Sequence, residues 1–419
     1  MDKRAVLPLT GSKKPGVFYG YIVALAAFFV MAIISGLLYS FGVFLKPLSV
    51  EFGWTRAMTA GAQSMALFIM GLLFMVTGRL NDRFGPRVIT TACGFFLGLG
   101  WLLMSRTSAL WQLYLFWGVI VAMGLSGGFV PMMSTVARWF VKRRGLMTGI
   151  VVAGVGVGTI IIPPVASWLI SSYDWRTAFI VIGIIALVIL IVAAQFLKRD
   201  PGEIGQLPYG EKETEPENLT SETRGFSLQE AVHTKQFRMV WAICFFRGIC
   251  LQTIMTHIVP YATDMGISAI IAANILAVVG GLSSAGRIGI GSISDRVGRM
   301  SSLIIGFSLL SVALLWLLFT SELWTFYLFA IIFGFSTGGL IALESPVVAE
   351  LFGLRAHGAI LGAVIFGATT GGAIGPILAG HIFDIANSYY LAFMACAILS
   401  IIGTILVSLL RSIRREDLR

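Results

Sequence analysis

The sequence contains twelve long stretches that almost entirely lack Asp, Glu, Lys and Arg. Each stretch is long enough to cross a bilayer, which takes about 20 helical residues at ~1.5 Å each. Backbone amides find no hydrogen-bond partner in lipid, so unbroken apolar stretches of this length cross it as helices. Only Arg247 interrupts one of them. The stretches are residues 21–45, 57–78, 88–105, 107–137, 145–173, 177–197, 239–262, 265–286, 300–321, 323–343, 358–383 and 385–410.

The composition excludes a water-soluble globule. Hydrophobic residues make up 57% of the 419 residues and charged residues only 12%. A chain of this kind would expose large apolar areas in water. We therefore predict an all-α integral membrane protein with twelve transmembrane helices, surrounded by the lipid bilayer. The expected location is the plasma membrane, which in a bacterium is the inner membrane.

The positive charges alternate by loop. If both termini lie in the cytoplasm, 24 of the 30 Lys and Arg residues fall on the cytoplasmic side. Only Lys46, Arg56, Arg106 and Arg176 then face outward. Cytoplasmic loops of membrane proteins carry such an excess of positive residues. The net charge of +10 is thereby explained without nucleic-acid binding, which we exclude.

A polar segment rich in Glu, Pro and Gly, residues 198–235, divides the spans six and six. It has the composition of a linker. We predict an N-terminal six-helix bundle at 1–197, a cytoplasmic linker at 198–235 and a C-terminal six-helix bundle at 236–419. Ser227 followed by Glu230 fits a capping box, which predicts a short surface helix before the seventh span.

The two halves share a sequence pattern. "GRLNDRFG" at 78–85 matches "GSISDRVG" at 291–298, and we call the spacing from Gly78 to Gly291 the repeat offset. The same offset relates four glycines of the fifth span to four of the eleventh, which predicts close helix contacts. The chain is therefore a duplicated six-helix unit with a cavity between the halves. The glycines are Gly145, Gly149, Gly154 and Gly158, matched to Gly358, Gly362, Gly367 and Gly371.

The motif of residues 78–87 resembles the loop signature of the major facilitator superfamily. "RWFVKRRGLMTGIVVAGVGVG" at 138–158 and "HIVPYATDMGIS" at 257–268 resemble the monocarboxylate transporter family and its bacterial anion-exchanging relatives. The resemblance implies a major facilitator fold and secondary transport by alternating access, with no enzyme activity. It also implies that Arg287, the arginine of the eighth span, anchors a carboxylate.

Arg287 attracts attention on physical grounds as well. It lies eight residues before Asp295, about 12 Å along a helix, which is too far for easy snorkelling. A charge at mid-membrane costs about 2.5 to 3.5 kcal/mol and is rarely kept without a partner or a wet cavity. Ser283 and other small residues share its helical face, and no acid does. A guanidinium binds a carboxylate through two parallel hydrogen bonds, so we predict an organic anion as its ligand. The alternative is a salt bridge with Glu344.

The span 239–262 carries further candidates. Cys250, Thr253, His257 and Tyr261 form a stripe that we expect to face the cavity. His257 is a candidate for contact with the substrate or a proton, because imidazole titrates near neutral pH. Arg247, nearer the start of the span, is either a ligand contact or an inner-gate or packing residue.

The resemblance also assigns Tyr39 to the cavity wall. Where the animal monocarboxylate transporters have a lysine four residues after this tyrosine, the chain has Val43. Where they have an aspartate one turn before the arginine, it has Ser283. The remaining candidates for handling a proton are His257 and Glu344.

The two loop motifs carry charges that we expect to latch the cytoplasmic side in the outward-open state. An aspartate can cap a neighbouring helix and pair with nearby arginines. The residues of this predicted gate are Asp82, Arg83, Arg87, Asp295, Arg296 and Arg299.

The predicted function is proton-coupled symport of a small monocarboxylate such as lactate or pyruvate. Moving a monoanion alone into a negative interior is opposed by about 2.3 kcal/mol per 100 mV. A co-transported proton removes this penalty, and so does anion exchange. The alternative is therefore an exchanger of dicarboxylates or of oxalate and formate, which would use both Arg247 and Arg287. Phe41, Met65 and Phe335 are expected to supply the apolar part of the cavity.

A receptor or membrane enzyme is the competing class. It would need an added soluble domain or a nucleophile and base, and the sequence shows neither. The four cysteines fall in apolar stretches without metal-ligand spacing, so we expect no metal and no cofactor. We expect the monomer to be the functional unit.

Overall fold

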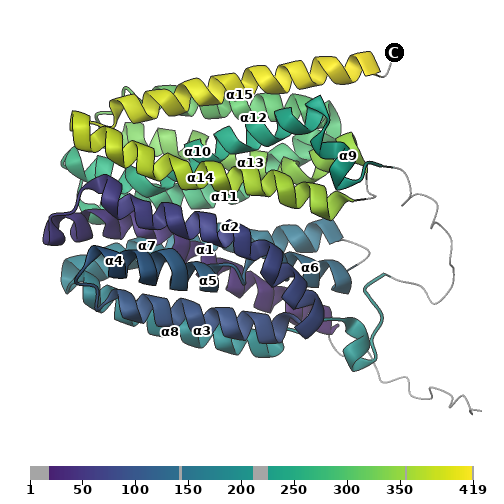
Figure 1. Ribbon diagram of the computed structural model, residues 1–419, viewed down its shortest axis with the longest axis horizontal. Coiled ribbons are helices and arrows are strands. Elements are labelled where there is room, and N and C mark those ends of the chain that lie inside the picture. The colour runs from purple at the N-terminus through teal and green to yellow at the C-terminus, as the bar shows by residue number, and fades with distance from the viewer. Residues whose placement is uncertain (1–17, 141–143, 211–224, 354–355, 418–419) are drawn as a thin grey trace, which may run out of the picture.

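The structure is a computed structural model that describes residues 18–140, 144–210, 225–353 and 356–417 (Figure 1). Twelve helices in these ranges are long and apolar enough to cross a membrane, which confirms the predicted number. Eleven spans are the helices α1 Tyr19–Phe52, α2 Arg56–Phe84, α3 Pro86–Met104, α7 Arg144–Ser172, α8 Trp175–Phe196, α10 Lys235–Asp264, α11 Ala269–Val297, α12 Arg299–Leu317, α13 Leu323–Phe352, α14 His357–Ala386 and α15 Tyr390–Asp417.

The fourth span is irregular. It runs over Leu110–Trp139 and combines α4 Leu110–Leu113, a π-helical segment Tyr114–Val121, α5 Ala122–Leu125 and α6 Phe129–Trp139. Such π-helical segments are rare and interrupt the regular backbone ladder. Nothing in the sequence pattern indicated this interruption.

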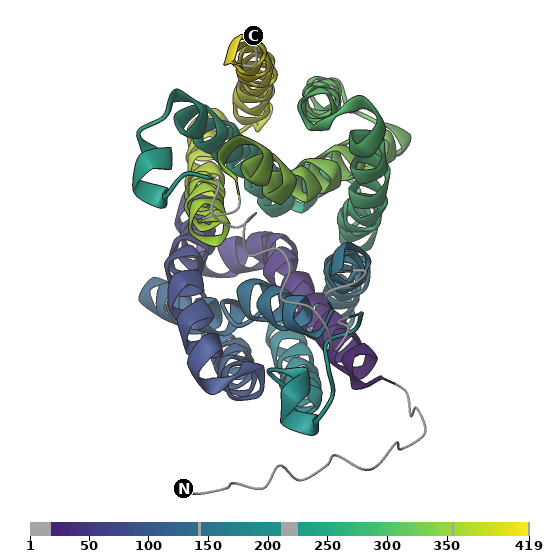
Figure 2. The same cartoon turned by 90° about the vertical axis from the view of Figure 1, so that its right-hand side faces the viewer.

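The spans form two blocks. Helices α1 to α8 lie in one block and α10 to α15 in the other, with the helices of both running in similar directions (Figure 1). Figure 2 looks along the helices and shows the blocks facing each other. We call residues 1–197 and 236–419 the N-half and the C-half. The linker end is the end where α2 finishes at Phe84 and α10 begins at Lys235, and the distal end is the opposite one.

The internal repeat extends to helix packing. A Cβ atom on Gly158 would lie 1.8 Å from the carbonyl oxygen of Ala32, so α7 and α1 touch through this glycine. A Cβ on Gly371 would lie 2.1 Å from the carbonyl oxygen of Phe245, which joins α14 to α10 in the same way. Ala32 and Phe245 are themselves related by the repeat offset. The predicted close packing through glycines is thus confirmed at this pair of positions.

The loops after α2 and α11 also share one backbone geometry. Gly85 and Gly298 have φ angles of 81° and 87°, which favour glycine because other residues are strained there. Their N–H groups donate to the carbonyl oxygens of Asn81 at 2.9 Å and Ser294 at 3.0 Å. The matching glycines in the sequence therefore mark two equivalent turns.

The predicted capping box is present before the seventh span. The short helix α9 Leu228–Val232 starts at Ser227, whose N–H donates to Glu230 Oε2 at 2.7 Å. The N–H of Glu230 donates back to Ser227 Oγ at 3.2 Å. Phe226 is tied to the end of α13, because its N–H donates to the Phe352 carbonyl at 2.9 Å.

Each half has its own aromatic core. In the N-half, Phe44 stacks on Phe179 with ring centroids 4.0 Å apart, and Phe41 lies 4.7 Å from Trp117. Phe41 is therefore part of this core, and the expectation that it lines the cavity is wrong. The C-half packs around other aromatic residues, Phe307, Phe326, Phe329, Phe333 and Tyr389.

Candidate functional site

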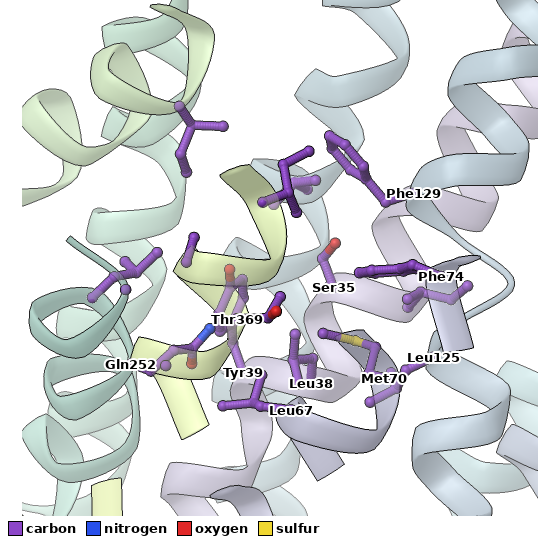
Figure 3. A pocket seen from close by; sticks show the side chains of 18 of the residues that line it. Ser35, Leu38, Tyr39, Leu67, Met70, Phe74, Leu125, Phe129, Gln252 and Thr369 are labelled. Carbon is purple, nitrogen blue, oxygen red and sulfur yellow. The ribbon is translucent and has the colours of Figure 1, made fainter. Parts of the chain in front are cut away.

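A cavity of about 180 Å³ lies between the two halves and is lined from both of them. Its described lining contains three charged side chains, Arg247, Arg287 and Glu344. Uncharged polar groups come from α1, α10 and α14. Figure 3 shows these groups, Ser35, Tyr39, Gln252 and Thr369, around the same space.

Arg247 and Glu344 form an ion pair in the cavity wall. Nη2 of Arg247, on α10, donates to Oε1 of Glu344, on α13. Both side chains are largely buried, with 7% and 13% of their surfaces exposed. The expected alternative of a bridge between Glu344 and Arg287 is wrong, because the carboxylate is taken by Arg247.

Arg287 has no such partner among the described side chains. Its Nη1 donates to the carbonyl oxygen of Val152 on α7 at 2.7 Å, and its Nε is buried without a hydrogen bond to any described residue. Among the side chains that the structure describes, no carboxylate forms a salt bridge with it. Since Arg247 and Glu344 cancel, the described lining of the cavity carries one net positive charge.

Two more predicted residues lie beside Arg287. A smaller cavity of about 20 Å³ is bounded by Arg287, Tyr39, Ser283, Thr159 and Thr337. This volume is close to that of one water molecule, about 10 to 15 Å³ on the same measure. The structure therefore brings Arg287, Tyr39 and Ser283 together, as predicted, and adds two hydroxyl groups from Thr159 and Thr337.

The stripe on α10 does not line either cavity. His257 is completely buried, with Nε2 against the carbonyl oxygen of Pro376 at 2.8 Å and Nδ1 against the Tyr389 hydroxyl at 3.0 Å. The thiol of Cys250 donates to the Cys396 carbonyl at 3.3 Å. These partners belong to α14 and to α15 with its preceding residue. The expected orientation is wrong, because this face of α10 packs inside the C-half.

The other members of the stripe follow His257. Thr253 lies beside α14, where a Cβ on Gly375 would be 2.5 Å from its Oγ1. The hydroxyl of Tyr261 lies 3.4 Å from that of Thr320. The uncharged polar residue that α10 does present to the cavity is Gln252, next in sequence to Thr253.

The apolar lining also differs from the expectation. Met65 lies against the π-helical segment of the fourth span, where a Cβ on Gly118 would be 3.1 Å from its sulfur. The ring of Phe335 lies against α11, 2.9 Å from the Cβ position of Gly289. Neither borders the cavity of about 180 Å³. Its apolar side chains come instead from positions such as Met70, Phe74 and Phe129.

The lining follows the internal repeat. Six positions of the N-half border the cavity together with the six positions of the C-half that the repeat offset assigns to them. Both arginines fall in the C-half, and their N-half counterparts are apolar. The pairs are Ile34 and Arg247, Ser35 and Gly248, Leu38 and Leu251, Tyr39 and Gln252, Phe74 and Arg287, and Val155 and Ala368.

A charged cluster joins the halves at the distal end. Asp264, at the end of α10, pairs with Lys46 at 2.9 Å and with Arg56 at 2.6 Å. Arg56 also donates to the Tyr389 hydroxyl at 2.7 Å. The sequence reasoning missed this cluster, although opposite charges at the ends of several spans were the available signal.

Asp384 also joins the two halves at the distal end. Its two carboxylate oxygens accept the backbone N–H groups of Arg56 and Ala57 at 2.9 Å each. These N–H groups open helix α2, so an acid of the C-half caps a helix of the N-half. The guanidinium of Arg56 lies 3.8 Å above the ring of Phe383. The cavity is therefore closed toward the distal end.

At the linker end two arginines of the predicted gate, Arg87 and Arg299, bond within their own halves. Arg87 Nε donates to Gln195 Oε1 at 2.9 Å, and Arg299 pairs with Glu350 at 3.3 Å. Arg83 and Arg296 are exposed. The side chains of the other two predicted gate residues, Asp82 and Asp295, lie outside the described residues. The latch stays a prediction.

The sequence matches a protein-family model and several known transporters. The family model of the Major Facilitator Superfamily matches residues 23–311 and 288–419. Monocarboxylate transporter 13 of Rattus norvegicus is 27% identical over 406 residues, covering 94% of this chain and 89% of the relative. The MFS-type transporter YhjX of Escherichia coli (strain K12) is 26% identical, covering 76% of this chain and 78% of the relative.

A solved structure shares the fold. The crystal structure of a bacterial homologue of the human lysosomal transporter Spinster, in an inward-facing and unoccupied conformation, superposes with a TM-score of 0.75. It covers 94% of this chain and 98% of its own, at 16% sequence identity. At that identity the likeness concerns the fold alone.

Proposed function

Since the chain belongs to the Major Facilitator Superfamily and is a multi-pass membrane transporter, we propose that it moves a small monocarboxylate together with a proton. The proposal rests on the position and the charge of Arg287. Its guanidinium borders the cavity between the halves and has no described carboxylate partner, while Glu344 is bonded to Arg247. A single net positive charge matches a single carboxylate.

The anion binds in this proposal with its carboxylate on Arg287. A guanidinium offers parallel donors that match the two carboxylate oxygens. Tyr39 and Ser283 border the space beside Arg287 and can add hydroxyl donors. The relatives named as monocarboxylate transporters support this class of cargo.

Glu344 is the proposed proton site. It is the one carboxylate in the described lining of the cavity, and protonating it would release Arg247 from the ion pair. Carrying a proton with the anion makes the cycle electroneutral, so the membrane potential of about 2.3 kcal/mol per 100 mV no longer opposes uptake. His257 is not proposed for this role, because both of its ring nitrogens have protein partners away from the cavity.

The proposed orientation places the linker end in the cytoplasm, following the excess of Lys and Arg there. The closed distal end then corresponds to a state that faces the cytoplasm. Transport requires the distal cluster to open while the linker end closes, as in other transporters built from repeated bundles. The proposed location is the plasma membrane, and the monomer is the proposed unit.

Exchange of dicarboxylates or of oxalate and formate is the competing proposal. It would require a second free cation for the second carboxylate. The ion pair between Arg247 and Glu344 leaves Arg287 as the one cation of the described lining without an acid partner. We therefore favour the monoanion.

The test is uptake of labelled lactate and pyruvate by the purified protein in liposomes. An inward proton gradient should accelerate uptake, and Arg287→Gln should abolish its saturable part. Arg106→Gln, at an exposed position after α3, is the matched control and should transport normally. A strict requirement for anion on the opposite side would instead support exchange, and unchanged affinity in Arg287→Gln would refute the anchor.

A further inference from the structure

Phe74 is the repeat counterpart of Arg287. The repeat offset carries one position onto the other, and both side chains border the cavity. Phe74 lies ten residues before the end of α2 at Phe84, and Arg287 lies ten residues before the end of α11 at Val297. They therefore lie at similar depth on opposite walls.

The same exchange occurs on a second pair of helices. Ile34, on α1, is the counterpart of Arg247, on α10, and it too borders the cavity. The C-half thus presents two cations at positions where the duplicated N-half presents an aromatic and an aliphatic side chain. The two halves therefore differ in charge at lining positions that the repeat offset makes equivalent.

The remaining lining of the N-half is mostly apolar as well. Figure 3 shows Met70, Phe74, Leu125 and Phe129 gathered on one side of the space, with Gln252 on the other. Leu38 and Leu67 continue this wall toward Tyr39. Two N-half residues of the lining are polar, Ser35 and Tyr39, and both lie on α1.

This asymmetry has a chemical consequence for the cargo. If a very small hydrophilic anion bound to Arg287, the aromatic and aliphatic side chains of the facing wall would stay in contact with water. Apolar surface removed from water favours binding by about fourfold for each buried methylene group. A ligand with an apolar group beyond its carboxylate would cover both walls at once.

We infer that Phe74 and Met70 form the centre of an apolar subsite that holds the side group of the transported acid. This inference rests on the proposed function, since it takes the carboxylate to lie on Arg287. The favoured cargo is then a monocarboxylate with a branched aliphatic or aromatic group, such as a 2-oxo acid of five or more carbons. Lactate and pyruvate fill only the charged part of the site.

The test is a binding series in which the head group is constant and the side group grows. Pyruvate, 2-oxobutanoate, 2-oxopentanoate, 4-methyl-2-oxopentanoate and phenylpyruvate are titrated calorimetrically into the purified protein in lipid nanodiscs. The heat measured with Arg287→Gln reports binding that does not use the anchor. This heat is subtracted from that of the wild type. Affinity should rise about fourfold per added methylene, so that 4-methyl-2-oxopentanoate binds at least tenfold more tightly than pyruvate.

Phe74→Asn should flatten this series, so that the affinities of the variant for pyruvate and for 4-methyl-2-oxopentanoate differ by less than about threefold. Phe319→Asn, at an exposed position after α12, is the control and should keep the full slope. If Phe74→Asn does not elute as a single species, Met70→Gln tests the same wall with a side chain of similar length.

The two levels of the proposal fail differently. Binding that depends on Arg287 but does not change along the series overturns the apolar subsite and leaves the anchor intact. An unchanged slope in both Phe74→Asn and Met70→Gln also overturns it. If Arg287→Gln binds every acid as tightly as the wild type does, the proposed function itself is overturned.

Discussion

Glu344 pairs with Arg247 and not with Arg287, although all three side chains border the same cavity. The pairing decides which cation is available to an anion from solution. It also places a titratable carboxylate next to the binding site. The roles of the three residues can be separated by substitution.

Glu344→Gln should remove the proton dependence of uptake while keeping Arg287-dependent binding. The variant also leaves Arg247 without its acid in a largely buried position. Breaking a buried ion pair from one side costs about 3 to 5 kcal/mol, so the melting temperature should fall. Uptake into liposomes with and without a pH gradient gives the first result, and thermal unfolding gives the second.

The control for stability is the double variant Arg247→Met with Glu344→Gln. It removes the stranded charge and should recover most of the lost melting temperature, because neutral replacement of a buried pair is often tolerated. Proton-stimulated uptake that survives in Glu344→Gln would exclude this carboxylate as the coupling group.

Asp384→Asn should weaken the closed distal end. The carboxylate accepts two backbone N–H groups at the start of α2, and hydrogen bonds to a charged group contribute about 1.5 to 3 kcal/mol each. Losing the charge should shift the population toward the state open at the distal end by at least tenfold. Spin labels at Met58→Cys and Ile385→Cys, both exposed and both near this end, would report a longer distance.

Asp174→Asn is the matched control for that measurement. Asp174 is also an acid at a helix start near the distal end, but it caps α8 of its own half through the N–H of Thr177. The distance between the labels should not change. An identical distribution in Asp384→Asn and the parent protein would show that the cap does not hold the halves together.

His257→Asn should destabilise the protein without changing substrate affinity. The ring nitrogens of His257 lie at hydrogen-bond distance from Pro376 and Tyr389, and a buried group left unpaired costs about 1 to 3 kcal/mol. Tyr389→Phe removes one of these bonds and should give a smaller loss. Melting temperature and the concentration dependence of uptake are the two measurements. A large change in the affinity for the acid, with normal stability, would show that His257 belongs to the binding site.

Arg287 could be predicted from the sequence because a lone charge deep in an apolar span is costly and therefore conspicuous. The twelve spans and the glycine contacts followed from equally general physics. The orientation of α10 did not. In the most apolar window of this span 72% of the residues are buried, and apolar residues occupy all of its faces, so hydropathy marks no face as cavity-facing. Gln252 and Thr253 are adjacent in sequence and yet lie on different faces.

Phe74 could not be found for a related reason. It is one of 30 phenylalanines, and its residue type alone gives no information on its surroundings. The signal was the repeat offset, which relates it to Arg287. That relation becomes informative only when both positions are known to border one cavity. The distal cluster needed the same knowledge, since its members come from four separate helices and a loop.

Gly371→Ala should disrupt the C-half, and Gly362→Ala on the same helix should not. A Cβ on Gly371 would lie 2.1 Å from the Phe245 carbonyl oxygen, so α14 and α10 would have to separate. Overpacking of this kind costs about 1 to 3 kcal/mol. Among the described residues, no atom outside the local helix backbone lies within 4 Å of the Cβ position of Gly362, and alanine favours a helix over glycine by about 1 kcal/mol. Thermal unfolding of both variants measures the contrast. Because Gly158 makes the equivalent contact in the N-half, Gly158→Ala should cause a loss of similar size, and a normal melting temperature in either variant would contradict the close packing of the repeat.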